Sequence, residues 1–333
     1  MDTLRARALQ FEAQMGGPSI VVCARGDFSD VLRGALEGVP VQIDRIASPD
    51  RLPGLLESRP PLFVLDFDSL GAECESFWDA LAAVQPRPQV LAIASPKRPE
   101  EVGALFIRYR ATNLLARNGQ IHPGDLRSTV LKILHGRIFG LEHYLGSGTT
   151  VEEQPFTGSA VKPALLELAQ RCAKAAGLDH RRVEQVGAVA DEMITNALYN
   201  APVDQSGRSR HGDWPRTRPV ELQPGEQATL RVGADGRRMA ISVSDPFGSL
   251  GSGRVLDYLA KCFRRDDDQI DSKEGGAGLG LYLMFNAVSH FVINIAVGRR
   301  TEFIGIIDIT PTYREFASRS KSFNLFVESP DPA

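Results

Sequence analysis

The stretch DSKEGGAGLGLYLMF, residues 271–285, places four glycines within six residues, directly before an apolar run with a helical pattern. Gly275, Gly276, Gly278 and Gly280 leave the backbone sterically open, so that N–H groups can approach an anion closely. The helix that follows would present its positive N-terminal end to the same anion. The stretch therefore predicts a mobile, phosphate-binding segment.

Two better-known phosphate motifs do not fit this chain. A dinucleotide fold needs its glycines directly after a buried strand, whereas residues 264–274 read RRDDDQIDSKE, which is a solvated loop, and the glycine spacing differs. The segment GSGTT (146–150) lacks the lysine and the preceding strand of a Walker motif. We interpret it as part of a linker.

Composition excludes several functional classes. The chain has 333 residues, of which 43% are hydrophobic and 24% charged, as in ordinary globular proteins of about two domains. The net charge of −3 argues against nucleic acid as a partner. No apolar run approaches the roughly 18 residues needed to span a membrane, and the N-terminus mixes charges throughout. We expect a cytoplasmic protein.

The four cysteines indicate neither a metal site nor a redox pair. They lack C-x-x-C spacing and nearby histidines, so we expect reduced, mostly buried thiols. They are Cys23, Cys74, Cys172 and Cys262.

The N-terminal part alternates short apolar runs with helical patterns, from Ser19 to about Phe139. The strand candidates are SIVVCA, VQIDRIA, LFVLDF, QVLAIA and ATNLLA. Parallel strands need crossover connections, which are usually helical. The rhythm therefore predicts a flavodoxin-like, doubly wound α/β domain with a parallel sheet.

The rhythm changes after a segment rich in Gly, Thr and Ser at 146–158. Helical patterns cover about 160–176 and 180–200, an irregular stretch fills 201–226, and the runs ATLRVGA, RMAISVSD, FVINIAVG and TEFIGIIDI are strand candidates. A helix candidate, GRVLDYLAKCF, precedes the glycine stretch, and KSFNLFVES is a candidate edge strand. This order predicts an α+β two-layer sandwich with an antiparallel sheet.

The helical pattern VGAVADEMITNALYNAP carries a polar ridge opposite an apolar stripe. Glu192, Asn196 and Asn200 are four residues apart, so they follow one side of the helix. A carboxylate and amide oxygens in this arrangement can hold Mg²⁺ and activate a hydroxyl beside it. A solvated helix face would show the same pattern. The ridge therefore supports a Mg²⁺ site only in combination with other elements of the sequence.

A second polar element follows the strand AISVSD. Asp245 ends this strand and enters a turn with Gly248 and Gly251. A strand-end carboxylate can accept a hydrogen bond from the amino group of a base, while glycines let the backbone pass close to the ring.

Together these elements, across about 156–310, resemble the GHKL ATP-binding domain of histidine kinases, gyrase-type ATPases and the serine kinases that act as bacterial anti-sigma factors. The resemblance implies that Glu192 is the catalytic base and that Asn196 holds Mg²⁺. It also implies a glycine-rich lid over the triphosphate of ATP. The residues that the resemblance assigns to nucleotide binding are Asn196, Asn200, Asp245, Gly248, Gly251, Lys273, Gly276, Gly278, Gly280 and Thr301.

Glu192 favours the anti-sigma branch, because sensor histidine kinases usually have asparagine at that position. The short linker also has no room for their separate helical hairpin, and His143 stands alone at the end of the first domain. The chain departs from the family in two places. The motif after Asp245 reads Asp-Pro-Phe-Gly, and Asn200 replaces a residue that is often basic. ATP binding could therefore persist without catalysis.

The irregular stretch 201–226 is longer than the resemblance requires. Its basic residues fit either a surface loop or a loop that docks a partner or contacts phosphate. They are Arg208, Arg210, His211, Arg216 and Arg218.

The first domain resembles the receiver domain of two-component systems. Asp66, Ser95 and Arg117 follow the third, fourth and fifth strands, where that family has its phosphoacceptor, switch hydroxyl and lysine. The acidic pair expected after the first strand is replaced by CARGD. Without it Mg²⁺ would bind poorly, so we favour a degenerate receiver that docks a partner or dimerises over a phosphorylated switch.

The expected organisation is an N-terminal helical extension (1–18), a receiver-like domain (19–142), a linker (143–158) and a GHKL-type domain (159–328). The leading hypothesis is a signalling protein that binds ATP and Mg²⁺ and either phosphorylates a protein partner on serine or threonine or sequesters it. A non-catalytic nucleotide-binding adaptor and a phosphorelay through His143 or Asp66 are the alternatives. Members of the two families that the chain resembles often form dimers, so a homodimer is one expected assembly.

Overall fold

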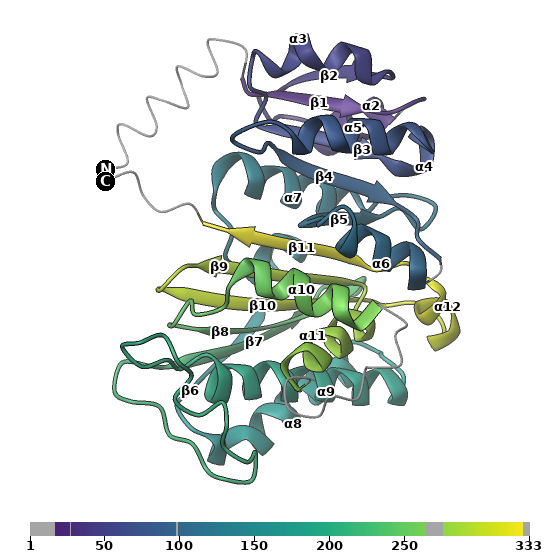
Figure 1. Cartoon of the computed structure of the whole chain (residues 1–333). Helices are drawn as coiled ribbons and strands as arrows, with labels where there is room; N and C mark the ends of the chain where they lie inside the picture. The colour runs from purple at the N-terminus through teal and green to yellow at the C-terminus, as the bar shows by residue number, and fades with distance from the viewer. Residues whose placement is uncertain (1–16, 27, 98, 264–275, 329–333) are drawn as a thin grey trace. The chain divides into compact units, whose positions relative to one another are not determined.

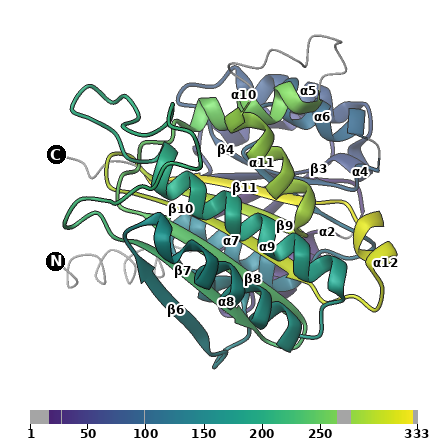
Figure 2. The same ribbon diagram turned by 90° about the horizontal axis from the view of Figure 1, so that it is seen from below.

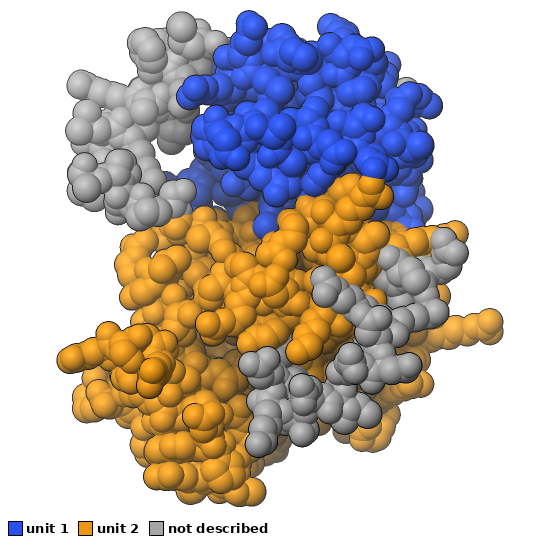
Figure 3. Space-filling model, in the orientation of Figure 1, with its two compact units in different colours: residues 1–95, 111–137 blue, residues 96–110, 138–333 orange. Residues whose placement is uncertain are grey.

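The computed structural model describes residues 17–26, 28–97, 99–263 and 276–328. Contacts divide the chain into two units (Figure 3): unit 1 holds residues 1–95 and 111–137, and unit 2 holds residues 96–110 and 138–333. Most of the expected extension at 1–18 lies outside the described residues. Within the described part of the chain, no helix is long and apolar enough to cross a membrane.

Unit 1 contains a parallel sheet with all five strands that the sequence predicts. Their order is β2-β1-β3-β4-β5, which is the flavodoxin-like order, and each pair of neighbours is parallel. The strands are β1 (Ser19–Cys23), β2 (Gln42–Ile46), β3 (Leu62–Asp66), β4 (Gln89–Ala94) and β5 (Asn113–Ala116).

Helices cover both faces of this sheet. Successive side chains of a strand point to opposite faces, and Val21 and Val22 of β1 are both fully buried. Val22 belongs to a core cluster with Leu32 and Val130, which come from α2 and α7. The helices of unit 1 are α2 (Phe28–Ala35), α3 (Leu52–Leu56), α4 (Phe67–Leu70), α5 (Glu73–Ala82) and α7 (Pro123–His135), with a 3-10 turn at Pro49–Arg51.

Unit 2 contains a mixed sheet in the order β11-β9-β10-β8-β7-β6. The pairings from β6 to β9 are antiparallel, as expected, whereas β11 runs parallel to β9. The strands are β6 (Val151–Phe156), β7 (Ala228–Ala234), β8 (Arg238–Asp245), β9 (His290–Ala296), β10 (Arg300–Asp308) and β11 (Ser322–Val327).

Three helices of unit 2 lie across one face of this sheet, as Figure 2 shows for α8, α9 and α11. The Asp179 carboxylate caps α9 by accepting a hydrogen bond from the Arg182 backbone N–H at 3.0 Å. The helices are α6 (Pro99–Ile107), α8 (Lys162–Ala175), α9 (His180–Thr195), α10 (Ser252–Phe263), α11 (Gly276–Ala287) and α12 (Tyr313–Ser318). A π-helical turn, η4 (Asn196–Asn200), extends α9.

The expected linker at 143–158 includes strand β6, which pairs with β7. Its sequence VEEQPF lacks the apolar alternation that identifies a strand, because four of its six residues are exposed. Charged side chains and Pro155 are typical of an edge strand, where they oppose pairing with another chain.

Helix α6 belongs to unit 2, although the sequence places it inside the expected receiver-like domain (19–142). Phe106 is fully buried and stacks on Phe263, with ring centroids 5.8 Å apart. Its ring also meets Phe285 and Phe323 edge-on, at 5.7 and 5.3 Å. This aromatic cluster explains the boundary, since α6 buries its apolar side against α10, α11 and β11 (Figure 1).

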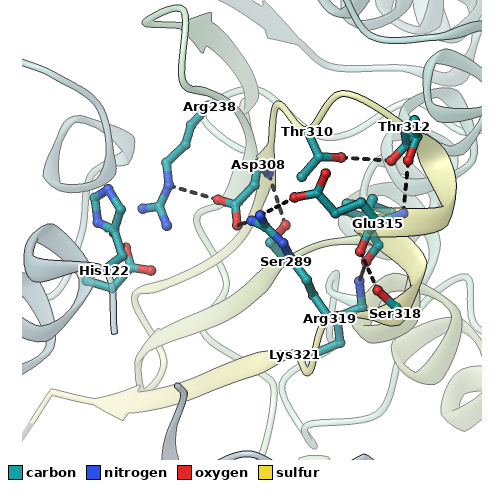
Figure 4. A network of polar contacts seen from close by, with 12 residues as sticks. His122, Arg238, Ser289, Asp308, Thr310, Thr312, Glu315, Ser318, Arg319 and Lys321 are labelled. Atoms are coloured by element: carbon teal, nitrogen blue, oxygen red, sulfur yellow. Dashed lines mark hydrogen bonds and ion pairs between the residues drawn. The ribbon is translucent and has the colours of Figure 1, made fainter. Parts of the chain in front are cut away.

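A polar network closes the C-terminal end of β10 (Figure 4). Asp308 accepts a hydrogen bond from Arg238 at 3.0 Å and forms an ion pair with Arg319 at 3.4 Å. The ammonium group of Lys321 donates to the Phe316 carbonyl at 3.3 Å and lies 3.8 Å from the centre of its ring. Burial lowers the pKa of Lys321 to about 8, although Asp308 opposes this shift.

Candidate functional site

A cavity of about 100 Å³ opens in unit 2 beside the end of β8. The elements that form its wall are β8, β10, the π-helical turn η4, α10 and α11. The residues that line it are Asn196, Asn200, Ala201, Asp245, Ser249, Leu250, Arg254, Tyr258, Leu281, Thr301 and Phe303. Four residues assigned to nucleotide binding from the sequence therefore share one cavity: Asn196, Asn200, Asp245 and Thr301.

Asp245 supplies a buried acceptor to this cavity. The carboxylate, 4% exposed, accepts a hydrogen bond from the Phe247 backbone N–H at 2.9 Å. Burial raises the pKa of Asp245 to about 7, against the lowering effects of hydrogen bonds from the backbone at Phe247, Gly248 and Thr301. The group is therefore close to half ionised near neutral pH and can change its hydrogen-bonding role with pH.

Thr301 lies opposite Asp245 in the β10–β8 register. Its hydroxyl is buried and has no hydrogen-bond partner among the described residues. A buried polar group without a partner is costly, and a ligand in the cavity would supply the missing partner. Asp245 and Thr301 thus offer an acceptor and a donor on neighbouring strands.

Gly248 and Gly251 shape the loop but are not part of the cavity wall. Gly248 has φ +57°, and a Cβ there would collide with the backbone of Ala296 and Arg299. Only glycine lets the loop after Asp245 pack against the turn between β9 and β10. Gly251 precedes α10, and its carbonyl accepts a hydrogen bond from Val255 at 3.2 Å.

The predicted ridge of Glu192, Asn196 and Asn200 forms a hydrogen-bonded chain. The Asn196 amide donates to Glu192 at 3.0 Å, and the Asn200 amide donates to Asn196 at 2.6 Å. Asn200 in turn accepts a hydrogen bond from the Arg216 guanidinium at 3.1 Å. The π-helical turn that carries Asn196 and Asn200 is a local irregularity of a kind often found at functional sites.

Glu192 itself is half-buried and is absent from the cavity wall. A Cβ at Gly280 of α11 would collide with the Glu192 carboxylate, so α11 passes directly over this side chain. Burial raises the pKa of Glu192, against the lowering effects of the Asn196 hydrogen bond and the Arg216 charge.

The sequence predicts the glycines just before a helix, whereas three of them lie within one. Gly276, Gly278 and Gly280 lie in helix α11, and Leu281 of this helix lines the cavity. The low helix propensity of glycine is overridden here, and the absence of a side chain at Gly280 leaves room for the Glu192 carboxylate. Lys273 and Gly275 lie outside the described residues.

Sequence reasoning missed Ser249, Arg254 and Tyr258 of the cavity wall. The Ser249 hydroxyl donates to the Ala201 carbonyl at 2.8 Å, which ties the loop after β8 to the end of η4. Arg254 and Tyr258 are four residues apart on α10, so they share one side of it. That spacing, just after the glycine turn, was the signal that could have identified them.

The stretch 201–226 is packed against the end of the ridge. The Tyr199 hydroxyl donates to the Arg218 carbonyl at 2.7 Å and to the Arg216 carbonyl at 3.2 Å. His211 is buried, and its Nδ1 contacts the Leu198 carbonyl at 3.0 Å. Arg210 forms an ion pair with Glu226 at 2.6 Å, and Arg208 is exposed.

Unit 1 brings together two of its three predicted site residues. Asp66 is buried and pairs with Arg117 at 2.8 Å, and it also accepts from the Ser69 N–H at the start of α4. The Ser95 hydroxyl instead donates to Asp68, at 2.8 Å. Asp66 therefore has the contacts of a helix cap and ion-pair partner.

His143 lies on a 3-10 turn (η2, Leu141–Tyr144), with its Nε2 3.1 Å from the Phe139 carbonyl. The four cysteines are free, and burial raises the pKa of each thiol, which disfavours the reactive thiolate. Across the described residues, no group of three or more His, Cys, Asp or Glu side chains could hold a metal ion.

The chain has low similarity to several solved structures. No protein-family model matches the sequence, and no curated protein sequence matches it significantly. A putative response regulator from Chloroflexus aurantiacus J-10-fl is 16% identical over 35% of this chain and 97% of its own, with a TM-score of 0.31.

Two further solved structures give similar values. The isolated REC domain of RcsB from Salmonella enterica serovar Typhimurium is 13% identical, with a TM-score of 0.31, over 38% of this chain and 95% of its own. NtrX from Brucella abortus, in complex with ATP, is 16% identical over 54% of this chain and 40% of its own, again with a TM-score of 0.31.

Proposed function

We propose that unit 2 binds ATP with Mg²⁺ and transfers the terminal phosphate to a serine or threonine hydroxyl of a protein partner. The observation that carries this proposal is that Asp245, Thr301 and Asn196 line one cavity. These residues come from β8, β10 and the π-helical turn η4, and the turn is distant in the sequence from both strands. A cavity with a few convergent polar groups is the general form of a small-molecule site.

The cavity chemistry fits a nucleotide. The Asp245 carboxylate can accept a hydrogen bond from an exocyclic amino group, and the unpartnered Thr301 hydroxyl can donate to a ring nitrogen. Leu281 and Phe303 give the same cavity apolar surface that can contact an adenine ring. This combination favours adenine over a purely anionic ligand.

The ridge supports the phosphate end of the proposal. Asn196 would hold Mg²⁺ through its amide oxygen, together with phosphate oxygens of the nucleotide, and the ion would neutralise phosphate charge there. Glu192 would accept the proton of the attacking hydroxyl. Its raised pKa suits a general base at neutral pH.

We further propose that unit 1 serves signalling as a docking module. The burial of Asp66 and its pairing with Arg117 favour a structural carboxylate over a phosphoacceptor. The partner is proposed to be a signalling protein.

Calorimetric titration tests nucleotide binding. The full chain is titrated with ATP in the presence and absence of Mg²⁺, as wild type and as Asp245→Ala. Loss of a hydrogen bond to a charged group should weaken ATP binding about ten- to a hundredfold. Asp213→Ala is the matched control, because Asp213 is exposed in the stretch 201–226. A wild-type chain that does not bind ATP at millimolar concentration would refute the proposal.

A second candidate, a nucleotide-binding adaptor without catalysis, is favoured by the position of Glu192 beneath Gly280, outside the cavity wall. Labelled ATP and an array of serine- and threonine-containing peptides separate the two. A kinase labels peptides, and Glu192→Gln abolishes the label while ATP still binds. An adaptor binds ATP and labels none.

A further inference from the structure

The basic stretch 201–226 has a defined position against η4. Tyr199 of η4 donates hydrogen bonds to two of its carbonyls, and the Ser209 hydroxyl donates to the Tyr199 carbonyl at 2.9 Å. The buried His211 adds a contact to the Leu198 carbonyl. These contacts fix the backbone around residue 216.

The Arg216 side chain is directed onto the polar ridge. Its guanidinium carbon lies 4.7 Å from the centre of the Tyr199 ring, and its Nη2 donates to Asn200. Asn200 lines the cavity, and the Arg216 charge lowers the pKa of Glu192. The cation therefore stands beside the Asn200 end of the ridge, next to Asn196, which we assign to Mg²⁺ and the phosphates.

The negative charge of ATP requires more positive charge near the ridge than Mg²⁺ supplies. ATP carries roughly four negative charges, and Mg²⁺ compensates two of them. Arg254 on α10 is the one cationic residue of the cavity wall within the described chain. A guanidinium has five N–H donors, and Arg216 uses one of them for Asn200, so further donors are available to a phosphate oxygen.

We infer that Arg216 binds the phosphate groups of the nucleotide, and that the stretch 201–226 supplies to the ridge a positive charge that η4 lacks. This inference rests on the proposed nucleotide site and adds a specificity residue to it. Asn200 acts as the positioning residue, because it lines the cavity and accepts a hydrogen bond from the guanidinium. Arg216 would discriminate ATP from nucleosides that carry no phosphate.

The test compares ATP, ADP and adenosine binding to the full chain by calorimetry, in wild type, Arg216→Gln and Arg216→Lys. Arg216→Gln should weaken ATP binding about ten- to a hundredfold and leave adenosine binding within about twofold. Arg216→Lys keeps the charge and should recover part of the loss. The dependence of ATP binding on salt concentration should also weaken in Arg216→Gln.

Arg218→Gln is the matched control. The Arg218 guanidinium carbon lies 3.4 Å from the centre of the Trp214 ring in the same stretch, so this side chain has a different stacking partner from Arg216. Its ATP binding should stay within about twofold of wild type. Thermal unfolding of each variant separates loss of fold from loss of binding.

The outcomes distinguish this inference from the proposed function. Wild type that binds ATP and adenosine equally well, or Arg216→Gln that weakens both alike, would overturn the role of Arg216 and leave the nucleotide site standing. Wild type that binds none of the three ligands would overturn the nucleotide site and this inference with it.

Discussion

Glu192 and Arg216 stand at the two ends of one continuous chain of side-chain hydrogen bonds, which passes through Asn196 and Asn200. Each amide donates toward the carboxylate and accepts from the side of the guanidinium. The chain fixes the orientation of both amides, and bonds in such a series polarise one another. A negative and a positive group are thereby held at opposite ends of one polar ridge.

Substitution of Gly280 tests the packing of α11 over Glu192. Gly280→Ala should displace the Glu192 carboxylate and abolish phosphate transfer, while stability changes by no more than about 1 kcal/mol, because alanine favours the helix and the clash falls on a flexible side chain. Urea unfolding and labelled-ATP transfer measure the two effects. Gly253→Ala in α10 is the control, since a Cβ there meets nothing. Retained transfer in Gly280→Ala would show that Glu192 is not constrained by α11.

The raised pKa of Asp245 predicts a pH-dependent stability. The unfolded state releases this proton near pH 4 and the folded state near pH 7, so this group lowers stability as pH rises through that window. Asp245→Asn removes the effect and should stabilise unit 2 at pH 8 by on the order of 2–4 kcal/mol. The check is urea unfolding at pH 5 and pH 8. A variant less stable than wild type at pH 8 would contradict the assignment.

ATP affinity should follow the same ionisation. An ionised Asp245 accepts a hydrogen bond from an amino group, and a protonated one loses most of that capacity. We expect affinity to fall as pH drops below about 7 in wild type. The measurement is calorimetry between pH 6 and pH 8, where the affinity of Asp245→Asn should depend less on pH than that of wild type.

The lowered pKa of Lys321 should make the protein more stable as the pH rises in the alkaline range, which is the opposite of the effect of Asp245. The pKa of Lys321 is about 8 in the folded state and about 10.5 when unfolded, so its contribution to stability rises between those values. Lys321→Met should remove this alkaline rise and stabilise the protein at pH 7 by about 1–2 kcal/mol. Thermal unfolding from pH 7 to pH 10 measures both effects. Lys261→Met, at an exposed position of α10, should leave the profile unchanged.

Phe106 tests the attachment of α6 to unit 2. Truncation of this fully buried ring in Phe106→Ala should cost about 3–5 kcal/mol. Leu283→Ala in α11 removes a side chain that is 57% exposed and should cost less than about 1 kcal/mol. Hydrogen exchange should show faster exchange in α10 and α11 of Phe106→Ala than of wild type. An equal loss of stability in both variants would contradict the proposed role of the aromatic cluster in attaching α6 to unit 2.

The sequence was most informative where local pattern and tertiary environment agree. Apolar runs identified every strand of unit 1, and the four-residue spacing from Glu192 correctly placed three side chains along one ridge. The strand-end position of Asp245 brought it to the cavity with Asn196. The inferences about helices and strands depend on the regular direction of side chains that the backbone of each element imposes.

Other features depend on contacts that no local pattern encodes. The close approach of Glu192 to Gly280 and the packing of Phe106 that attaches α6 to unit 2 both involve residues distant in the sequence. Strand β6 is exposed on most of its length, so it lacks the alternation by which strands are recognised. The position of Arg216 results from contacts with Tyr199, which is distant in the sequence. The irregular stretch 201–226 has no repeating pattern from which such contacts could be predicted.

The route of the chain through α6 limits how this protein can be dissected. A fragment that begins at residue 138 would lack a helix, and three phenylalanines would meet water where Phe106 had covered them. The complementary fragment, ending at residue 137, would carry that helix without the surface on which it packs. Both pieces would be prone to aggregation, so the two units cannot be exchanged as consecutive cassettes.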